Sequence, residues 1–361
     1  MLVERLELVD FRNYHEATFD LTAGTTCIIG QNGQGKTNLA EALAYLSGLT
    51  SFRQVPSDAL VRVGADQAII RAHIVEDDGR SSLIEVEIAR IGRGRVQVNR
   101  QRLQRTRDLL GTVRTSVFSP DDLTLVKGGP GERRRFLDDA LVALATKNDA
   151  LRLEVDRVLR QRNTLLRQCA GRLDDDAETT LDVWDARLVD VGERLGHGRA
   201  VLVERLQPLV DEAYTQLAGG SHHVCLTYDP SWRHEGLAAA LLNARTDDVR
   251  RGVSTVGPHR DELDLFINEL PARTHASQGE QRTLALSLRL GAHRLVTDHV
   301  GSSPVLILDD VLSELDDARA TALLGELPAG QVLITTASPL PTAASPDRVL
   351  RIHNGTVLHD E

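Results

Sequence analysis

Aromatic side chains are scarce in this chain of 361 residues, where Phe, Trp and Tyr together account for 3% of the sequence. Proteins that hold single-stranded nucleic acid without sequence preference use aromatic rings as stacking platforms for the bases. The composition therefore disfavours a surface of that kind. A nucleic-acid ligand would have to be held through its phosphate groups, which is how proteins bind duplex DNA without reading its sequence.

Cysteines and long apolar runs are also few. The three cysteines, Cys27, Cys169 and Cys225, are widely spaced and odd in number, which suits a reducing compartment and provides no pair for a zinc site. Apolar runs such as 305–308 fall far short of the roughly 20 residues that cross a membrane. The first five residues mix acidic and basic side chains, unlike a secretion signal. We expect a cytoplasmic protein that makes no contact with a membrane.

Positive charge is in deficit, since the formal net charge is -10. A protein with this balance is not a general polycation, so any nucleic-acid surface has to be a local basic face. One stretch, 90–107, contains seven arginines and no acidic residue. Two interpretations stay open for it: a DNA-binding face, or a solvated pair of strands. The DNA-binding candidates are Arg93, Arg95, Arg100, Arg102 and Arg105.

The hydrophobic and charged fractions, 41% and 26%, are those of an ordinary globular protein. The length suits one large α/β domain with an insertion, or two domains. Strand patterns dominate before about residue 125 and return after about residue 245, whereas the stretch between them has helical periodicity. We therefore expect an α/β fold with a discontinuous head, residues 1–125 and 246–361, and an inserted α-helical subdomain, residues 126–245.

The insertion is expected to contain a short antiparallel helical arm. Apolar residues recur at helical spacing over 151–165 and again over 181–195, on either side of the three aspartates at 174–176. Two such helices around a polar turn form a hairpin. A third helix around 202–213 is expected to bend at Pro208, because proline lacks the N–H that a helix interior needs.

A glycine-rich segment directly follows a β-rich run at 25–29 and precedes a helical pattern. Glycines let a backbone turn its N–H groups toward phosphate oxygens, and a following helix adds positive charge at its N-terminus. In the G-x-x-x-x-G-K-[ST] pattern that it matches, Lys36 reaches the β- and γ-phosphates and Thr37 coordinates Mg²⁺. A glycine turn that matches by chance is the alternative. The residues of this phosphate loop are Gly30, Gln31, Asn32, Gly33, Gln34, Gly35, Lys36 and Thr37.

Two acidic residues, Asp309 and Asp310, end the apolar run 305–308. An uninterrupted apolar run is typical of a strand buried on both faces, and the carboxyl end of such a strand opens onto the ligand-binding crevice of α/β folds. Asp309 is expected to hold Mg²⁺, directly or through water, and Asp310 to orient and polarise the attacking water. A solvated start of a loop is the alternative.

The segment 276–282 resembles the signature sequence of ABC-type ATPases, through Ser277, Gln278, Gly279 and Glu280. A serine hydroxyl and a glycine amide at a helix N-terminus can hold an anion, and the same residues can also form an ordinary capping box. Ser313 and Asp316 match the D-loop of that family. In ABC-type ATPases the signature covers the γ-phosphate of ATP bound by the partner subunit. The resemblance therefore implies an ATP-dependent homodimer in which Lys36 and Asp310 are catalytic.

Further segments resemble the RecF family of DNA replication and repair proteins. They are 10–14, 118–123, 127–130, 133–138 and 257–261. In the first of them, Arg12 and Asn13 match an "FRN" motif whose arginine helps to hold the nucleotide in the RecF and SMC group. The helical insertion is far too short for the long coiled coils of SMC proteins, and Cys169 lacks the C-x-x-C of a zinc hook. With the ABC motifs, the resemblance covers nearly the whole chain.

The RecF resemblance implies an ABC-type ATPase head of the SMC kind, with a mixed sheet, an antiparallel β subdomain and an inserted helical subdomain. It implies ATP and Mg²⁺ as cofactors, nucleoid association, binding of duplex DNA and of single/double-strand junctions, and delivery of the RecA recombinase to gaps together with the RecO and RecR proteins. An SMC-like architectural DNA clamp without a loading role is the alternative that stays open.

Departures from the general ABC pattern qualify these expectations. Asp310 stands where most ABC-type ATPases have glutamate, so slow hydrolysis that serves as a switch is expected. Ser119 and Thr335-Thr336 stand where transporter ATPases have a glutamine and a switch histidine, and those two roles do not transfer. The arginines at 133–135 are expected either to contact phosphate or to pair with Asp138 and Asp139.

Overall fold

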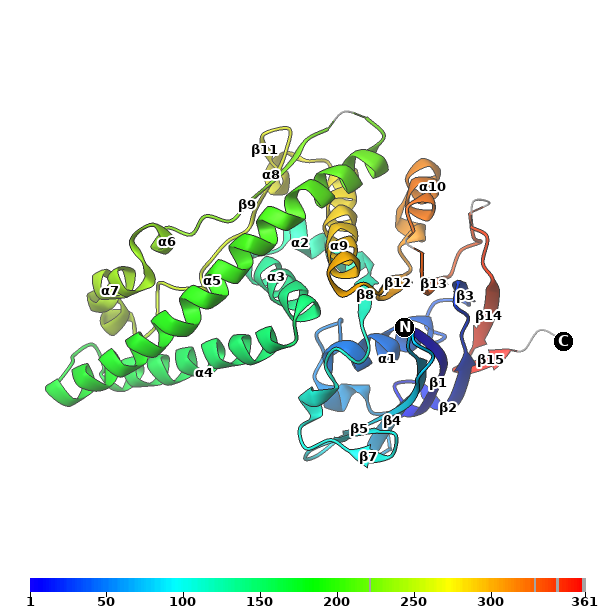
Figure 1. Ribbon diagram of the computed structural model, residues 1–361, viewed down its shortest axis with the longest axis horizontal. Helices are drawn as coiled ribbons and strands as arrows, with labels where there is room; N and C mark the ends of the chain where they lie inside the picture. Colours follow the sequence, from blue (N-terminus) through cyan, green and yellow to red (C-terminus); the bar gives the residue numbers. More distant parts are fainter. Residues whose placement is uncertain (221, 328, 342–343, 359–361) are drawn as a thin grey trace. The chain divides into compact units, whose positions relative to one another are not determined.

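The computed structural model describes residues 1–220, 222–327, 329–341 and 344–358 (Figure 1). The chain divides into two compact units. The first comprises Met1–Asp122, Gln216–Gly219 and Leu286–Glu361, and the second comprises Leu123–Thr215 and Gly220–Ala285. Within the described part of the chain, no helix combines the length and the apolar character that a membrane span needs.

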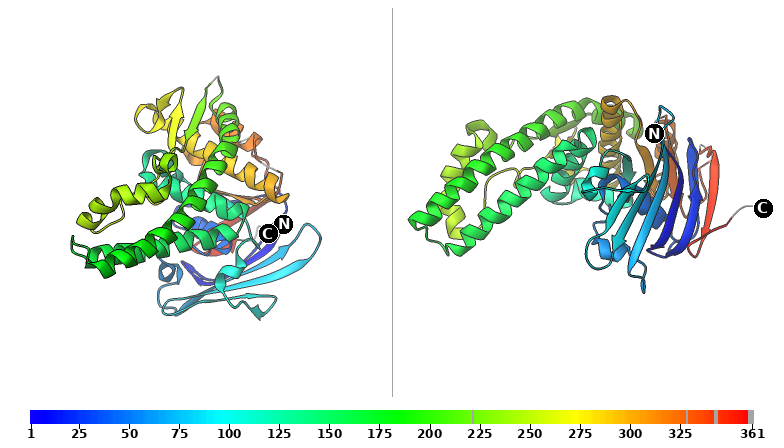
Figure 2. Two further views of the ribbon diagram at one scale, coloured as in Figure 1. Left: turned by 60° about the vertical axis from the view of Figure 1, so that its left-hand side comes forward. Right: turned by 60° about the horizontal axis from the view of Figure 1, so that its bottom comes forward.

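An antiparallel sheet of six strands forms one layer of the first unit, and Figure 2 shows its blue and cyan strands side by side. Side chains alternate between the buried and the exposed face, so Ala68, Ile70, Ala72 and Ile74 all point into the core, as expected for a sheet covered on one side. In spatial order the strands are β2 (Tyr14–Asp20), β1 (Leu2–Phe11), β4 (Gln67–Val75), β5 (Ser81–Ala89), β6 (Arg95–Val98) and β7 (Gln101–Arg102).

A second sheet of six strands in this unit is parallel except for the edge strand β15, which runs antiparallel to its neighbour β14. Every residue of β12 and β13 is buried, as in sheets that are covered on both faces. In spatial order the strands are β15 (Thr356–Leu358), β14 (Arg348–His353), β3 (Thr25–Ile29), β13 (Val332–Thr336), β12 (Val305–Asp309) and β8 (Thr115–Phe118). The mixed sheet and the antiparallel sheet together confirm the expected α/β class.

Helix α1 (Lys36–Gly48) supplies the core that joins the two sheets. Its Leu39 and Leu43 belong to one buried cluster that contains Ile70 of the antiparallel sheet and Ile307 of the parallel sheet. The helix that carries the phosphate loop is therefore fixed from both sides by apolar packing. This unit also contains most of α9 (Gln278–Val300), η1 (Ser57–Leu60), η2 (Thr106–Leu109), η3 (Pro120–Asp122), η4 (Leu312–Glu314) and α10 (Asp317–Gly325).

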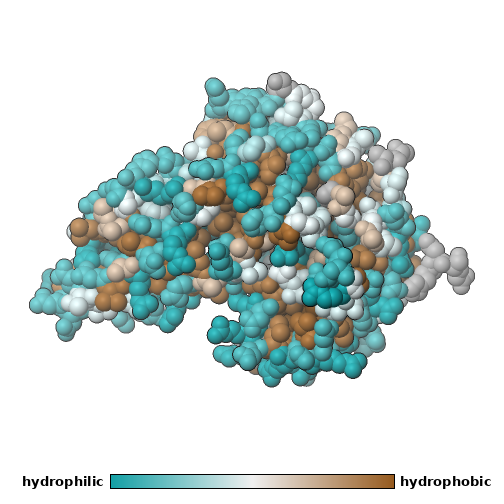
Figure 3. All heavy atoms as spheres, in the orientation of Figure 1, coloured by the Kyte–Doolittle hydropathy of each residue, from teal (hydrophilic) through white to brown (hydrophobic). Residues whose placement is uncertain are grey.

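The second unit is mainly helical. Helices α4 (Lys147–Gln168) and α5 (Asp175–Ala218) form the expected antiparallel arm, drawn in green in Figure 1. Teal hydrophilic residues dominate the face of this arm that Figure 3 shows, with brown apolar residues between them. The other elements are α2 (Leu123–Lys127), α3 (Pro130–Leu144), α6 (Trp232–Glu235), α7 (Leu237–Arg251), α8 (Ala272–His275), the sheet of β9 (Val224–Thr227), β10 (Asp264–Ile267) and β11 (Leu270–Pro271), and the start of α9 (Gln278–Val300).

The expectation of a separate third helix is wrong. Helix α5 is continuous over 44 residues and contains Pro208. A proline inside a helix costs about 3 kcal/mol or more because a hydrogen bond is lost. On either side of the proline, Leu202, Leu206 and Val210 are all at most 1% exposed. Burial of this apolar stripe offsets the cost of the proline and keeps the helix in one piece.

The second unit also continues beyond residue 245, where the insertion was expected to end. Strand β10 pairs with β9, and Arg133 of α3 forms two hydrogen bonds to Glu262, at 2.7 and 2.8 Å. These contacts attach the stretch 246–285 to the helices. They join residues that are distant in the sequence, so local sequence patterns could not predict where the second unit ends.

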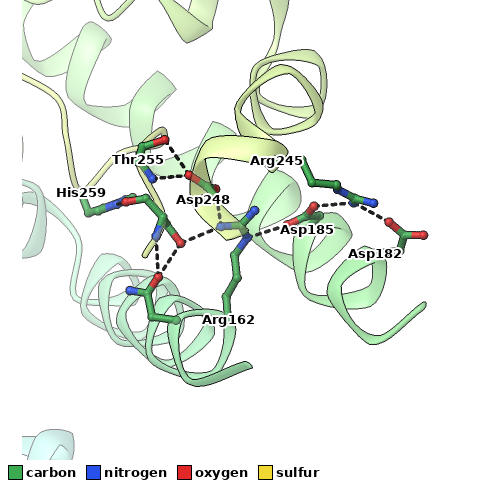
Figure 4. A network of polar contacts seen from close by, with 9 residues as sticks. Arg162, Asp182, Asp185, Arg245, Asp248, Thr255 and His259 are labelled. Atoms are coloured by element: carbon green, nitrogen blue, oxygen red, sulfur yellow. Dashed lines mark hydrogen bonds and ion pairs between the residues drawn. The ribbon is translucent and has the colours of Figure 1, made fainter. Parts of the chain in front are cut away.

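A buried arginine holds the helices of this unit together (Figure 4). The side chain of Arg162 on α4 is fully buried. It donates to Asp185 of α5 at 2.6 Å, to Asp248 of α7 at 2.7 Å and to the hydroxyl of Ser254 at 2.8 Å. The helical pattern assigned only apolar residues to this face of α4, and Arg162 was missed.

The segment Gly257–Asp261, which carries part of the family resemblance, is a second polar centre of this unit. The carboxylate of Asp261 accepts hydrogen bonds from the indole of Trp232, at 2.7 Å, and from the hydroxyl of Tyr228. Arg134 donates to the Asp261 carbonyl at 2.7 Å. Burial lowers the pKa of His259 to about 4, so this side chain is neutral at pH 7. The contacts of Asp261 join this segment to Arg134 of α3 and Trp232 of α6.

Replacing Arg162 with methionine is expected to lower the free energy of unfolding by about 3–5 kcal/mol, because buried carboxylates lose their partner. The control is Arg250→Met on α7. Arg250 pairs with Asp247 at 2.7 Å with both side chains at least half exposed, and such pairs contribute about 0–1 kcal/mol. Urea unfolding followed by circular dichroism measures both variants. Equal stability of the two would show that Arg162 does not hold the helices.

Candidate functional site

The phosphate loop connects β3 to α1 and is built on glycine conformations. Gly33 has φ 81° and Gly35 has φ 116°, values that side chains with a Cβ rarely adopt. Helix α1 begins at Lys36 and has no acidic residue in its first turn. The free N–H groups and the positive end of the helix dipole are therefore left for an anion.

The side chain of Lys36 folds back onto the phosphate loop. Its Nζ donates to the carbonyl of Gly30 at 2.8 Å and to the carbonyl of Gln31 at 3.0 Å. The residue is only 6% exposed. Burial lowers the pKa of Lys36, and the carboxylates of Asp310 and Asp309 act in the opposite direction. The structure thus places the ammonium group over the loop, within electrostatic reach of the two acidic residues.

Asp309 at the end of β12 faces the first turn of α1. Its Oδ1 accepts from the hydroxyl of Thr37 at 3.0 Å and from the hydroxyl of Thr335 at 2.7 Å. Thr335 is the residue opposite Asp309 in the parallel register with β13. Burial raises the pKa of Asp309, while the two hydroxyls act in the opposite direction. The structure thereby gives Thr335 a role in holding Asp309, one that requires the strand register and was missed.

Asp310 takes a left-handed backbone conformation, with φ 53°. Its N–H donates to the carbonyl and to the hydroxyl of Thr335, both at 3.1 Å. Its Oδ1 is buried and has no hydrogen-bond partner among the described residues. A carboxylate oxygen with spare acceptor capacity is what a water-polarising residue requires.

The two residues of the "FRN" motif do not have the same surroundings. The guanidinium of Arg12 makes two 2.7 Å hydrogen bonds to Glu41 and one of 3.0 Å to the carbonyl of Ala59. Asn13 donates from Nδ2 to the carbonyl of Gln34 at 3.1 Å. The structure therefore attaches Arg12 to helix α1 and Asn13 to the phosphate loop.

The signature residues lie in the second unit, where α9 begins. Ser277 N–H donates to Glu280 at 2.7 Å, and Glu280 N–H donates to the Ser277 hydroxyl at 3.3 Å. These reciprocal bonds confirm the capping box. Ser277 and Gln278 are exposed, and Gly279 is partly exposed. The predicted contact with ATP of a partner subunit is compatible with this exposure and stays a prediction.

The D-loop residues adjoin Asp310 in the first unit. The hydroxyl of Ser313 donates to the carbonyl of Asp310 at 2.8 Å. Asp316 begins helix α10, where it accepts from the backbone of Arg319 at 2.9 Å and pairs with that side chain at 2.6 Å. The backbone hydrogen bond from Arg319 is the main cause that holds the pKa of Asp316 below its ordinary value.

The arginines of the stretch 90–107 differ in what they contact. Arg90 is occupied by the carbonyls of Arg62 and Ala65, at 2.7 and 2.8 Å, and Arg95 pairs with Glu87 at 2.7 Å. Among the DNA-binding candidates, Arg105 begins the turn η2 through a backbone bond to Asp108. Four of the exposed candidates have a guanidinium without an ion pair to a described residue: Arg93, Arg100, Arg102 and Arg105. Both interpretations of this stretch stay open.

Two of the arginines at 133–135 pair with acidic side chains, but not with the expected ones, and Arg134 donates to the backbone carbonyl of Asp261. Arg133 is buried and pairs with Glu262, whereas Arg135 pairs with Glu132 at 3.3 Å within its helix. Arg199 and Arg152 pair with the two expected acids, Asp138 and Asp139. Apart from Glu132, these partners come from other helices and loops, which a pattern on one helix could not show.

Comparison with known proteins agrees with this geometry. The model of the RecF/RecN/SMC N terminal domain family matches residues 2–355. A protein of Streptomyces avermitilis, named DNA replication and repair protein RecF, is 47% identical over 355 residues, which cover 93% of this chain and 94% of that protein. The chain belongs to the RecF family. A protein of Nocardioides sp. with the same name is 43% identical over the whole of both chains.

Solved structures of the RecF family share the fold throughout. The structure of the recombination mediator protein RecF-ATPrS in the RecFOR pathway covers 99% of this chain and 97% of that chain, with a TM-score of 0.90 and 29% identity. An Smc head domain from Pyrococcus furiosus covers 98% of this chain and 94% of that chain, with a TM-score of 0.59 and 16% identity, a likeness of fold alone. The expected ABC-type head is thus confirmed.

Alanine substitutions at two loop glycines test how closely the RecF phosphate loop is supported. A Cβ at Gly33 meets no atom within 4 Å, whereas a Cβ at Gly35 lies 2.7 Å from Oη of Tyr14 and 2.8 Å from Nδ2 of Asn13. In both variants an alanine has to adopt a positive φ, which lowers the free energy of unfolding by about 1–2 kcal/mol. Gly35→Ala adds overpacking of about 1–3 kcal/mol. Thermal unfolding measures the difference; equal losses would show that the loop does not rest on these side chains.

Proposed function

We propose that this protein is an ATP-dependent DNA-binding protein of DNA replication and repair. It binds ATP in the phosphate loop, dimerises on ATP, and holds duplex DNA and single/double-strand junctions. In this role it helps to load the RecA recombinase at gaps. The observation that carries the proposal is the phosphate loop facing Asp309 and Asp310, with Lys36 bonded to two loop carbonyls.

ATP binding follows from what the loop offers. Its glycine backbone and the first turn of α1 supply N–H groups for phosphate oxygens. The ammonium group of Lys36 exchanges its two carbonyl partners for phosphate oxygens, which are charged and form stronger hydrogen bonds. A solved relative is described as RecF-ATP and has a TM-score of 0.90 at 29% identity, which supports the same ligand here.

The oxygen atoms of Thr37 and Asp309 fit Mg²⁺. The described part of the chain contains no cluster of three or more His, Cys, Asp or Glu residues that could hold a metal ion by itself. Mg²⁺ bound with a nucleotide does not need such a cluster, because it takes one or two protein oxygens together with phosphates and water. Oγ1 of Thr37 and Oδ1 of Asp309 lie 3.0 Å apart. The ion would neutralise charge on the terminal phosphates.

Hydrolysis is assigned to Asp310, whose buried Oδ1 has no partner among the described residues. This oxygen orients and polarises the attacking water, while Lys36 stabilises negative charge on the phosphates. The side chain is one methylene shorter than the glutamate used by most ABC-type ATPases. We expect slow turnover, in which ATP acts as a switch between two states of the protein.

Dimerisation is assigned to the signature. The exposed Ser277 and the amides of Gln278 and Gly279 cap the γ-phosphate of ATP held by Lys36 of a second chain, and the D-loop residues Ser313 and Asp316 cross the interface. Closure brings basic surfaces of two chains onto DNA, where Arg93, Arg100, Arg102 and Arg105 contact phosphates. A protein that acts on chromosomal DNA works in the nucleoid, and the RecFOR pathway named for the solved relative supports RecO and RecR as partners.

Substitution of Lys36 by alanine is expected to abolish ATP binding, because the cation that meets the phosphates is removed. The matched control is Lys147→Ala, which removes an exposed lysine at the start of α4. Isothermal titration with Mg·ATP measures both variants. Wild-type affinity in Lys36→Ala would refute the assignment of the phosphate loop.

Substitution of Ser277 by arginine is expected to leave ATP binding of the single chain intact and to remove ATP-driven dimers. Thr180→Arg, on an exposed part of α5, adds the same charge elsewhere and should dimerise like the wild type. Sedimentation velocity with and without ATP, in the presence of a gapped DNA duplex, distinguishes the species. Persistent ATP-dependent dimers of the Ser277→Arg variant would exclude the signature as the dimer contact.

A further inference from the structure

A phosphate-binding loop that directs its N–H groups at the ligand has to direct its carbonyl groups elsewhere. Buried carbonyls need hydrogen-bond donors, since an unpaired one lowers stability. Two carbonyls in this loop, those of Gly30 and Gln31, accept from Lys36. These bonds are lost when the ammonium group of Lys36 turns to a phosphate. The carbonyls of Gln34 and Gly35 have other donors.

The Gly35 carbonyl accepts from Leu39 N–H of α1 at 3.0 Å. Further donors are Asn13, just before β2, and Tyr14, the first residue of β2. The hydroxyl of the fully buried Tyr14 donates to the Gly35 carbonyl at 2.9 Å, and Nδ2 of Asn13 donates to the Gln34 carbonyl at 3.1 Å. A Cβ on Gly35 would lie less than 3 Å from both groups. The second half of the phosphate loop therefore lies directly on Asn13 and Tyr14.

The turn between β14 and β15 supplies further support. Gly355 N–H donates to the same Gln34 carbonyl at 3.1 Å, and Asn354 N–H donates to the Gln34 side chain. Neither contact involves an atom that a phosphate would approach. The bonds to Gln34 and Gly35 can persist when the bonds of Lys36 are exchanged.

The segment before β2 is itself anchored to α1. Glu41 is fully buried, and its carboxylate accepts twice from Arg12 at 2.7 Å and once from the hydroxyl of Ser51. Asn38 of the same helix donates to Oδ1 of Asn13 at 2.7 Å. Arg12 and Asn13 are thereby held to the helix that begins at Lys36.

We propose that Asn13 and Tyr14 are positioning residues for nucleotide binding. They fix the carbonyl side of the phosphate loop so that its N–H groups face the phosphates before a nucleotide arrives, and Glu41 anchors them through Arg12. This role acts through the loop and not by contact with the nucleotide. It rests on the proposed binding of ATP and adds Tyr14, which the motif did not mark, to the residues that determine affinity.

The experiment compares two tyrosine-to-phenylalanine variants. Tyr14→Phe removes the hydroxyl below the loop and retains the ring, which packs edge-on against Phe19. Tyr45→Phe removes a hydroxyl from another buried tyrosine, located on α1 and hydrogen-bonded to Ser57. Asn13→Ala, at an exposed side chain, is a second test variant. The measurements are the dissociation constant of Mg·ATP, hydrogen exchange of residues 30–39 without nucleotide, and the melting temperature.

Tyr14→Phe and Asn13→Ala are each expected to weaken Mg·ATP binding about three- to tenfold, the range that one lost hydrogen bond produces. Hydrogen exchange of residues 30–39 should become faster, because the loop samples more conformations. Tyr45→Phe should leave the affinity and the exchange of these residues unchanged. A merely structural role of Tyr14 predicts a lower melting temperature at unchanged affinity, and that result would overturn the proposal.

Failure of the proposed function has a different signature. If the wild type does not bind Mg·ATP, the assignment of ATP is wrong. The hydrogen-exchange comparison then still decides whether Tyr14 orders the loop: faster exchange in Tyr14→Phe than in Tyr45→Phe supports the positioning role, and equal exchange rejects it.

Discussion

The orientation of the peptide groups in the phosphate loop is the constraint on which the site depends. N–H groups aimed at an anion require carbonyls aimed away from it, and each of those carbonyls requires a donor. The donors are Lys36 and Leu39 of α1, Asn13 and Tyr14 at the start of β2, and the turn after β14. Some of these donors are distant from the loop in the sequence, so its conformation depends on tertiary contacts as well as on its own glycines.

The two units are stabilised in different ways. In the first, one apolar cluster joins α1 to side chains of both sheets, and the acids at the end of β12 lie at the rim of that core. In the second, Arg162 is fully buried among carboxylates, a pairing that is costly to break but adds modest stability compared with apolar packing. We infer that these charges fix one arrangement of α4, α5 and α7.

The local features of the fold were predictable from the sequence. Strand β3 has the expected bounds, 25–29, and the loop, its helix and the acid-ended strand occur in the expected order, because each rests on neighbouring residues. The partners of Arg133, the role of Thr335 and the burial of Arg162 were not predictable. Each depends on which distant residue lies opposite, and spacing along one element carries no such information. The continuity of α5 through Pro208 depended on burial in the same way.

We infer that Lys36 exchanges its hydrogen-bond partners when a nucleotide binds, while the other contacts that support the loop stay in place. A crystal structure with Mg²⁺ and a non-hydrolysable ATP analogue tests it directly. We predict that Nζ of Lys36 leaves the carbonyls of Gly30 and Gln31 for phosphate oxygens, with the bond from Tyr14 to the Gly35 carbonyl retained. A bound analogue with Lys36 still on both carbonyls, or a loop detached from Tyr14, would contradict the account.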